Sequence, residues 1–391
     1  MTRIITLFLL MCASAALADD SGKSRPARFA IIFNMGYAGD HLPKDKGEFE
    51  KLIATVKSAH FNVVLCKYED WRAAICKTHD VKIMVDLLTP EHHVYKNVGG
   101  AEKLCESLRG NDVVWGYHLW SDRIGGTVAG RSRDIANVKR WDPTHAAYVG
   151  SYNARGVGDL KNPDAIGYYD FHWRRGGHWR HLLRVSDAAR KTNSYFLRYC
   201  QPDPGQVGKG NYNRGLYTIT TSIAFGLKGY MYHFRGSELD RKTWKLNALG
   251  DDLAKINAQV APLGVELMKI GNPVAVFSTP VTKTAKDRPT GQEKPAVPQE
   301  FKPVPDDHWF AVKSGEFLVG EFPVTNDFAA LFCANHNSYQ TQSVSLTFSK
   351  TVKSVEHFDR KTGKWMALKA VSGAVAFSIP PATGELIRIR R

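Results

Sequence analysis

Apolar, β-rich runs alternate with amphipathic helical stretches from Arg28 to Ile270, and this alternation limits the possible folds more than any other feature. Eight apolar runs predict eight strands, at 29–34, 63–68, 81–88, 113–120, 146–152, 165–171, 194–200 and 229–234. The clearest helical patterns lie at 47–59, 101–109, 178–191 and 213–227, and a last helix is expected at 246–270. The order strand, helix, strand is typical of a parallel sheet with crossover helices.

Eight βα units in roughly 250 residues fit a (β/α)₈ TIM barrel, which the helix at 246–270 would close. A doubly wound open sheet is the alternative fold. No G-x-G-x-x-G motif follows the first strand, so a dinucleotide site of the Rossmann type lacks support, and we predict no cofactor.

The pattern changes from about Val274 to short alternating strands separated by turns, which predicts a small antiparallel β-sandwich domain. Its strands are expected at 316–322, 329–334, 343–349, 352–358, 364–367, 375–379 and 385–389, with a turn at 359–363. A stretch rich in Pro, Lys and Asp at 282–305 predicts a long exposed loop or an ordered insertion. The predicted division is a signal peptide at 1–18, a catalytic barrel at 19–272 and the β-sandwich at 273–391.

The first residues match a secretory signal peptide, with Arg3 ahead of an apolar run and Ala16-Leu17-Ala18 before Asp19. We therefore expect a secreted or periplasmic protein whose mature chain begins at Asp19. No later stretch approaches about 18 continuous apolar residues, so no membrane span is predicted.

The formal charge of +15 becomes +14 once Arg3 is lost with the signal peptide. A field of this size raises the local concentration of polyanions. In an exported protein we favour an acidic or sulfated polysaccharide over nucleic acid as the partner, and the alternative is a basic surface that only maintains solubility. The sequence does not predict an oligomeric state.

The mature chain keeps five of the six cysteines, and they are unpatterned, without C-x-x-C. Such a set indicates neither a disulfide framework nor a zinc site, so we expect mostly core cysteines, although export permits one or two bridges. His92-His93 and the histidines at 172, 178 and 181 lack the spacing of a zinc motif, and no metal is predicted.

The fourth predicted strand ends abruptly in polar and aromatic groups, as the segment Gly116-Tyr117-His118-Leu119-Trp120-Ser121-Asp122-Arg123. This segment resembles the fourth strand, G-Y-Y-L-x-D-E-P, of a family of secreted (β/α)₈ glycoside-hydrolase-like proteins. The resemblance continues through 142–143, 168–173, 224–234, 256–257 and 263–264, and in the C-terminal part through 320–322 and 361–365. It implies a barrel that hydrolyses glycosidic bonds.

Two departures from that family bear on the mechanism. Asp122 stands where the resemblance implies the presumed acid, and it is one methylene shorter than the family's Glu. The seventh strand ends Arg198-Tyr199-Cys200-Gln201, without the Glu nucleophile of many retaining barrel glycosidases, so a two-glutamate retaining mechanism is not supported.

Glycosidic bond cleavage needs an acid and a second carboxylate, and strand-end carboxylates are few in this chain. Asp86, Glu238 and Asp240 lie near strand ends, but Asp122 and Asp170 are the preferred catalytic pair because both fall in the matched motifs. Asp122 could instead pair with Arg123 or cap the next helix, and Asp170 could hold a neighbouring arginine. A separation of about 5–5.5 Å between the carboxyl groups would indicate retention, and about 6.5–9.5 Å inversion.

Aromatic, imidazole and amide groups also collect at the strand ends, and they suit a saccharide cleft because aromatic faces pack on sugar rings. Each aromatic residue taken singly is more often a core residue. The predicted substrate-binding residues are Asn34, His118, Trp120, Tyr152, Asn153, Tyr169, His172, Trp173, Arg198, Gln201, Tyr232, His233 and Arg235.

Two alternatives to a hydrolase stay open. A polysaccharide lyase would use a Tyr or His base with an arginine that neutralises a uronate, for which Tyr169, His172, Tyr232, His233 and Arg198 are available. A non-catalytic carbohydrate-binding barrel would be consistent with the altered Asp-Glu-Pro motif.

Overall fold

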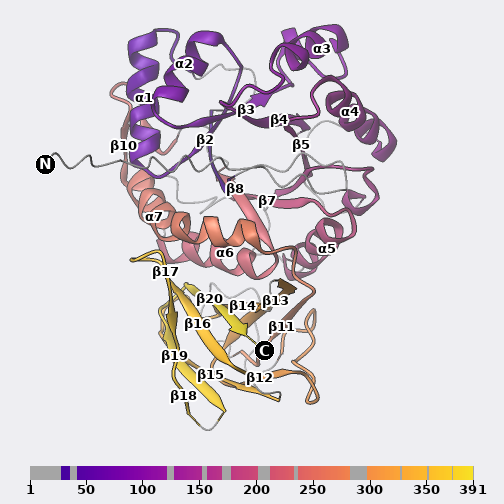
Figure 1. Cartoon of the computed structure of the whole chain (residues 1–391). Helices are drawn as coiled ribbons and strands as arrows, with labels where there is room; N and C mark the ends of the chain where they lie inside the picture. The colour runs from indigo at the N-terminus through magenta and orange to yellow at the C-terminus, as the bar shows by residue number, and fades with distance from the viewer. Residues whose placement is uncertain are drawn as a thin grey trace, which may run out of the picture.

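The computed structural model describes residues 28–35, 42–120, 127–151, 156–169, 178–200, 212–232, 237–281, 297–325, 328–349, 352–371 and 373–390. In these ranges, eight parallel strands close into a barrel in the order β1 to β8, and β8 pairs with β1. Figure 1 shows the barrel strands within a ring of helices, with the C-terminal sheets below them. The closed barrel confirms the predicted fold class and rules out the open sheet.

The strands of the barrel are short, and each alternates with a helical segment. They are β1 (Ala30–Asn34), β2 (Val63–Cys66), β3 (Lys82–Asp86), β4 (Val114–Trp120), β5 (Ala146–Ser151), β6 (Ala165–Tyr169), β7 (Tyr195–Cys200) and β8 (Leu227–Tyr232). The helices are α1 (Lys46–Ser58), α2 (Asp70–Thr78), α3 (Val98–Ser107), α4 (Val128–Trp141), α5 (His178–Lys191), α6 (Tyr212–Ala224) and α7 (Ala248–Lys269), with 3₁₀ turns η2 (Pro90–His92) and η3 (Val157–Asp159). A small hairpin of β9 (Leu239–Asp240) and β10 (Lys245–Leu246) precedes α7.

Side-chain caps fix several helix starts near the predicted positions. The carboxylate of Asp45 accepts a hydrogen bond from the Glu48 amide at 3.0 Å, and Asn247 caps α7 through the Gly250 amide at 3.1 Å. Asn97 caps the Gly100 amide at 3.1 Å, so α3 begins three residues before the predicted 101. The sequence prediction followed apolar periodicity and passed over this cap.

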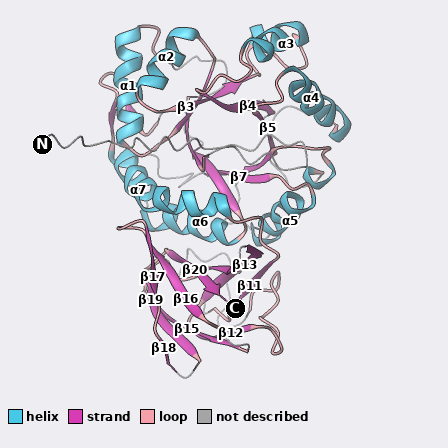
Figure 2. Cartoon of the chain, viewed as in Figure 1, coloured by secondary structure: helices cyan, strands magenta, loops and turns pink. Residues whose placement is uncertain are grey.

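Strand side chains divide between two cores because they alternate in direction. An interior cluster fills the barrel with Ala30, Ile32, Val63, Leu65, Met84, Trp115, Ala146, Tyr148, Ala165, Leu197, Tyr199 and Met231. The opposite faces pack under the surrounding helices, which Figure 2 shows in cyan. The barrel is therefore a filled core, and its ends are the places where chemistry can occur.

The C-terminal region forms two antiparallel sheets. The six-stranded sheet has the order β11 (Ala275–Ser278), β13 (Phe317–Thr325), β14 (Phe328–Asn335), β20 (Gly384–Arg390), β16 (Ser354–Asp359) and β17 (Lys364–Ala367). The four-stranded sheet has the order β12 (Phe310–Ser314), β15 (Gln342–Phe348), β19 (Ala374–Ile379) and β18 (Ala370–Val371). One apolar cluster joins residues of both sheets, among them Phe310, Val344, Leu331 and Ile387.

The helix α6 joins the barrel to the six-stranded sheet. Every residue from Arg214 to Ala224 is buried, and the helix contacts β7 and β8 as well as β13 and β14. The fit is close, since a Cβ placed on Gly320 of β13 would lie 2.2 Å from the carbonyl oxygen of Ala224. Lys228 adds a polar tie, donating to the carbonyls of Ile270 at 2.7 Å and Gly271 at 3.2 Å.

The expected loop at 282–305 falls partly outside the described residues. Within its described part, Phe301 is buried against Trp179 of α5 and Phe225. That part of the segment is thus a packing element and not simply an exposed loop.

The five cysteines at 66, 76, 105, 200 and 333 are buried free thiols. Burial raises the pKa of Cys66 and of Cys333 to about 12, so both are inert core residues. Among the described residues, no helix is long and apolar enough to cross a membrane.

Candidate functional site

The carboxyl ends of β1, β3, β4 and β7, together with the middle of β5, place a layer of polar side chains inside the barrel, and its two tyrosines are also part of the interior cluster. Its members are Asn34, Asp86, His118, Tyr148 and Tyr199, and each is at most 1% exposed. Because the strands are parallel, their carboxyl ends lie at one end of the barrel, where enzymes with this fold carry their active sites. This layer is the floor of the candidate site.

Asp86 and His118 form the first part of the floor. They are register partners on β3 and β4, and Nδ1 of His118 lies 3.2 Å from Oδ1 of Asp86. The imidazole stacks on the ring of Tyr148, with 5.5 Å between the centroids and an interplanar angle of 26°. Gly167 of β6 makes room for Tyr148, because a Cβ there would lie 2.1 Å from its hydroxyl.

Asn34 and Tyr199 form the second part of the floor, across β1 and β7. The side-chain amide of Asn34 donates to the hydroxyl of Tyr199, and it lies 3.4 Å from the carbonyl oxygen of Tyr232. These bonds fix the Asn34 amide at the strand end, where the sequence predicted it.

Arg198 and Tyr232, predicted to bind substrate, instead face the surrounding helices. Arg198 is fully buried and donates to the carbonyl oxygen of Thr218 in α6 at 2.6 Å. The hydroxyl of Tyr232 lies 3.4 Å from Oδ1 of Asn257 in α7. Side chains alternate along a strand, so Tyr199 points inward and its neighbour Arg198 points outward. Arg198 and Tyr232 therefore both help to pack the strands against the outer helices.

Trp120 also lies outside the barrel interior, although it has the same parity as His118. The register of β4 against β5 shifts between His118 and Trp120, and this irregularity reverses the side on which the indole lies. Trp120 stacks on Tyr95 at 5.0 Å and 15°, and the guanidinium of Arg131 lies 5.3 Å from its ring centroid. The prediction that Trp120 binds substrate is therefore not carried further.

The remaining predicted site residues lie outside the described residues. These are Asp122, Tyr152, Asn153, Asp170, His172, Trp173, Gln201, His233 and Arg235. Tyr169 ends β6, and nothing is described of its side chain. In the sequence, Asp122 follows the end of β4 by two residues and Asp170 follows the end of β6 by one.

Two buried carboxyl groups at this end are absent from the predicted site. Asp86 is the last residue of β3 and lies two positions after Met84, whose side chain points into the barrel. Strand alternation alone could therefore have identified Asp86 as an inward-facing carboxyl group. Glu238 follows β8 and is 1% exposed, although it stands outside any recognisable strand pattern. Across the described ranges, no group of three His, Cys, Asp or Glu side chains is close enough to hold a metal.

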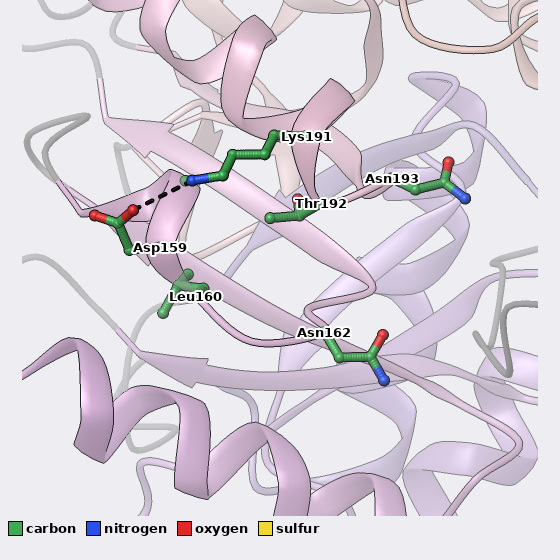
Figure 3. A pocket seen from close by; sticks show the side chains of 7 residues that line it. Asp159, Leu160, Asn162, Lys191, Thr192 and Asn193 are labelled. Carbon is green, nitrogen blue, oxygen red and sulfur yellow. Dashed lines mark hydrogen bonds and ion pairs between the residues drawn. The ribbon is translucent and has the colours of Figure 1, made fainter.

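A surface hollow of about 540 Å³ lies at the other end of the barrel (Figure 3). It is lined by Gly158, Asp159, Leu160, Asn162, Lys191, Thr192 and Asn193, which belong to segments leading into β6 and β7. Lys191 and Asp159 form an exposed ion pair across it at 3.4 Å. Its position at the amino ends of the strands separates it from the polar floor.

Comparison with known proteins relates this chain to others through structure alone. No family model matches the sequence. No curated protein matches it either.

Solved structures of the same architecture align with most of the chain. An α-amylase of Geobacillus thermoleovorans, complexed with acarbose, is 11% identical with a TM-score of 0.52 and covers 94% of this chain and 99% of its own. A candidate α-galactosidase of Bacteroides fragilis is 9% identical with a TM-score of 0.56, covering 93% and 80%. α-Galactosidase I of Mortierella vinacea is 8% identical with a TM-score of 0.50, covering 93% and 97%. At such identities the likeness shows the fold alone, a (β/α)₈ barrel that this chain shares with these three proteins.

Proposed function

We propose that this protein is a glycoside hydrolase whose active site lies at the carboxyl end of its barrel. The observation that carries the proposal is the layer of buried polar side chains at that end, where β4 and β6 end shortly before Asp122 and Asp170 in the sequence. The architecture shared with an α-amylase and with α-galactosidases supports the same chemistry.

In this proposal Asp122 is the general acid that protonates the leaving oxygen, and Asp170 is the second carboxylate. β4 and β6 are separated by a single strand in the barrel, so their carboxyl ends lie at the same end and near one another. Asn34 and His118 contribute hydrogen-bonding groups from the floor. The other substrate contacts are assigned to the predicted residues of the strand-end loops, namely Tyr152, Asn153, Tyr169, His172, Trp173, Gln201, His233 and Arg235.

We further propose an anionic substrate, a sulfated or uronic-acid polysaccharide or its oligosaccharides. The formal charge supports this, and so does the helix that follows β6. Arg180 and Arg184 lie one turn apart near the start of α5 and are exposed. Because α5 follows β6, the first half of this helix is the half nearer the carboxyl end of the barrel, and guanidinium binds sulfate and carboxylate in bidentate fashion.

A polysaccharide lyase is the second candidate. Of the groups predicted for it, Arg198 and Tyr232 are engaged with the outer helices, so its base and its arginine would have to come from other residues at the strand ends. A non-catalytic carbohydrate-binding barrel is the third candidate.

Export through a signal peptide completes the proposal, and N-terminal sequencing of the native protein should find Asp19 first.

The test compares the wild type with Asp122→Asn and Asp170→Asn on sulfated, uronic and neutral glycans. Loss of a general acid should lower kcat by about 10²- to 10⁴-fold. Asp159→Asn, in the hollow at the opposite end, is the matched control and should retain full activity. Equal product from Asp122→Asn and the wild type would overturn the assignment. Product absorbing in the ultraviolet would indicate a lyase, and binding without product a carbohydrate-binding barrel.

A further inference from the structure

The helices α4 and α5 and the turn η3 between them form one outer face of the barrel. Figure 1 shows α4 and α5 on the same side of the barrel. The turn packs closely on α4, since a Cβ placed on Gly156 would lie 2.9 Å from Cγ2 of Val128. It also contacts α5, where a Cβ on Gly158 would lie 3.5 Å from Cβ of Ala188. The three elements therefore present a continuous surface.

The charged side chains exposed on this face are mostly cations. Within its described residues the exposed carboxylates belong to Asp159 and Asp187. Each is already paired, Asp159 with Lys191 at 3.4 Å and Asp187 with Arg190 at 2.9 Å. The exposed cations of the face that form no ion pair with any described residue are Arg140, Lys161, Arg180 and Arg184. The face thus has a positive charge that the protein does not neutralise.

These cations extend along the whole side of the barrel. Arg180 and Arg184 lie one turn apart in the first half of α5, which is nearer the carboxyl end of the strands. Arg140 lies in the last turn of α4, and Lys161 precedes β6, so both are nearer the amino end. The 14 residues of α5 alone span about 21 Å. A ligand that contacts all of these cations must be an extended chain.

We propose that this face binds an anionic polysaccharide outside the active site, through Arg140, Lys161, Arg180 and Arg184. The inference rests on the proposed function and deepens it, because it makes the substrate a polymer and not a free oligosaccharide. Guanidinium groups suit such a chain, since they bind sulfate and carboxylate in bidentate fashion. The exposed cations also raise the concentration of the polyanion near the barrel and speed its encounter with the protein.

The test measures binding of dextran sulfate to the full chain by calorimetry, with unsulfated dextran of the same length as the neutral counterpart. Arg180→Ala/Arg184→Ala and Arg140→Ala/Lys161→Ala remove cations from opposite ends of the face. Each double variant should weaken binding of dextran sulfate about two- to thirtyfold, because exposed ion pairs with sulfate are lost. Unsulfated dextran should not distinguish either variant from the wild type.

Lys361→Ala/Lys364→Ala is the matched control, because it removes the same charge from exposed lysines of the C-terminal region that form no ion pair with described residues. It should bind dextran sulfate as the wild type does. Equal weakening by the control would show that only net charge matters, and this would overturn the proposal. Wild-type affinity of Arg140→Ala/Lys161→Ala would overturn it too, as would no binding by the wild type or tighter binding of a DNA duplex.

The outcome is separate from that of the proposed hydrolysis, because binding is measured without turnover. Binding that depends on the face, with no product from any glycan, would contradict the hydrolase and leave the face as that of a carbohydrate-binding barrel. Product from a glycan, with the same dextran sulfate affinity in all variants, would overturn the binding face and leave the hydrolase in place.

Discussion

Each end of the barrel contains a buried Asp–His pair, and the two pairs have different roles. At the amino end, Asp142 precedes β5 and lies 2.6 Å from Nδ1 of His145. The hydroxyl of Tyr117 donates to the same carboxylate at 2.6 Å, and the Thr144 amide donates to it at 2.8 Å. At the carboxyl end, Asp86 accepts from the Leu88 amide and from a histidine of the site floor.

The difference shows that the position of an Asp–His pair in the fold decides its role, although the side chains are the same. Asp142 collects donors from β4, from the turn after α4 and from His145, which itself lies 3.0 Å from the carbonyl oxygen of Asn111. That network ties chain segments together at the amino end of the barrel. In TIM barrels, polar groups at the amino end serve stability and those at the carboxyl end serve chemistry.

Removing Asp142 should give the largest effect on stability. Asp142→Ala leaves His145 and Tyr117 buried without their shared acceptor, which should lower the free energy of unfolding by about 3–5 kcal/mol. Urea denaturation followed by tryptophan fluorescence measures it. Activity per folded molecule should be unchanged, and a loss of kcat with unchanged stability would show that the two ends are not divided in this way.

The same carboxylate predicts acid sensitivity. Burial alone would raise the pKa of Asp142, but hydrogen bonds from His145, Thr144 and Tyr117 outweigh it, and the pKa lies well below its usual range. A depressed pKa in the folded state gives stability that is complete above the unfolded value, about 3.9. This stability should be lost as pH falls below about 4. Asp142→Asn should show a flatter decline there, and parallel curves for the two proteins would contradict the prediction.

The floor should tolerate less crowding than the surface. Gly167→Ala places a Cβ against the hydroxyl of Tyr148, so the tyrosine must shift from its stack on His118. We expect the free energy of unfolding, measured by thermal denaturation, to fall by about 1–3 kcal/mol. Activity should also be reduced. Gly158→Ala is the control, because its Cβ would meet Ala188 at an ordinary 3.5 Å. Equal melting of the two variants would show that Tyr148 is loosely held.

The smallest effect should come from the hollow. Asp159→Asn removes the ion pair with Lys191, whose side chains are 71% and 67% exposed. Exposed pairs contribute little, so the free energy of unfolding should change by no more than about 0.5 kcal/mol. A larger change in the same urea titration would mean that this end holds a site of its own.

The barrel could be predicted because buried parallel strands and crossover helices leave two different periods in the sequence. The C-terminal strands β13 to β17, β19 and β20 were predicted from their short alternating pattern, whereas β11, β12 and β18 were not.

The site could be predicted only to the level of the strand ends. Parity identifies Asn34 and His118 as inward, but the register shift in β4 turns Trp120 outward, and no residue type marks such a shift. The sequence does not distinguish a buried arginine that donates to α6 from an arginine that binds sulfate, and for this reason Arg198 was predicted to bind substrate.

The helix α6 has no solvent face, because the barrel strands bury one side and the C-terminal sheet buries the other. A gene fragment that ends after α7 would therefore encode a barrel with an uncovered apolar helix, prone to aggregation. Barrel and sheets are expected to melt in a single cooperative transition, and in this chain the C-terminal region cannot be exchanged as a detachable module.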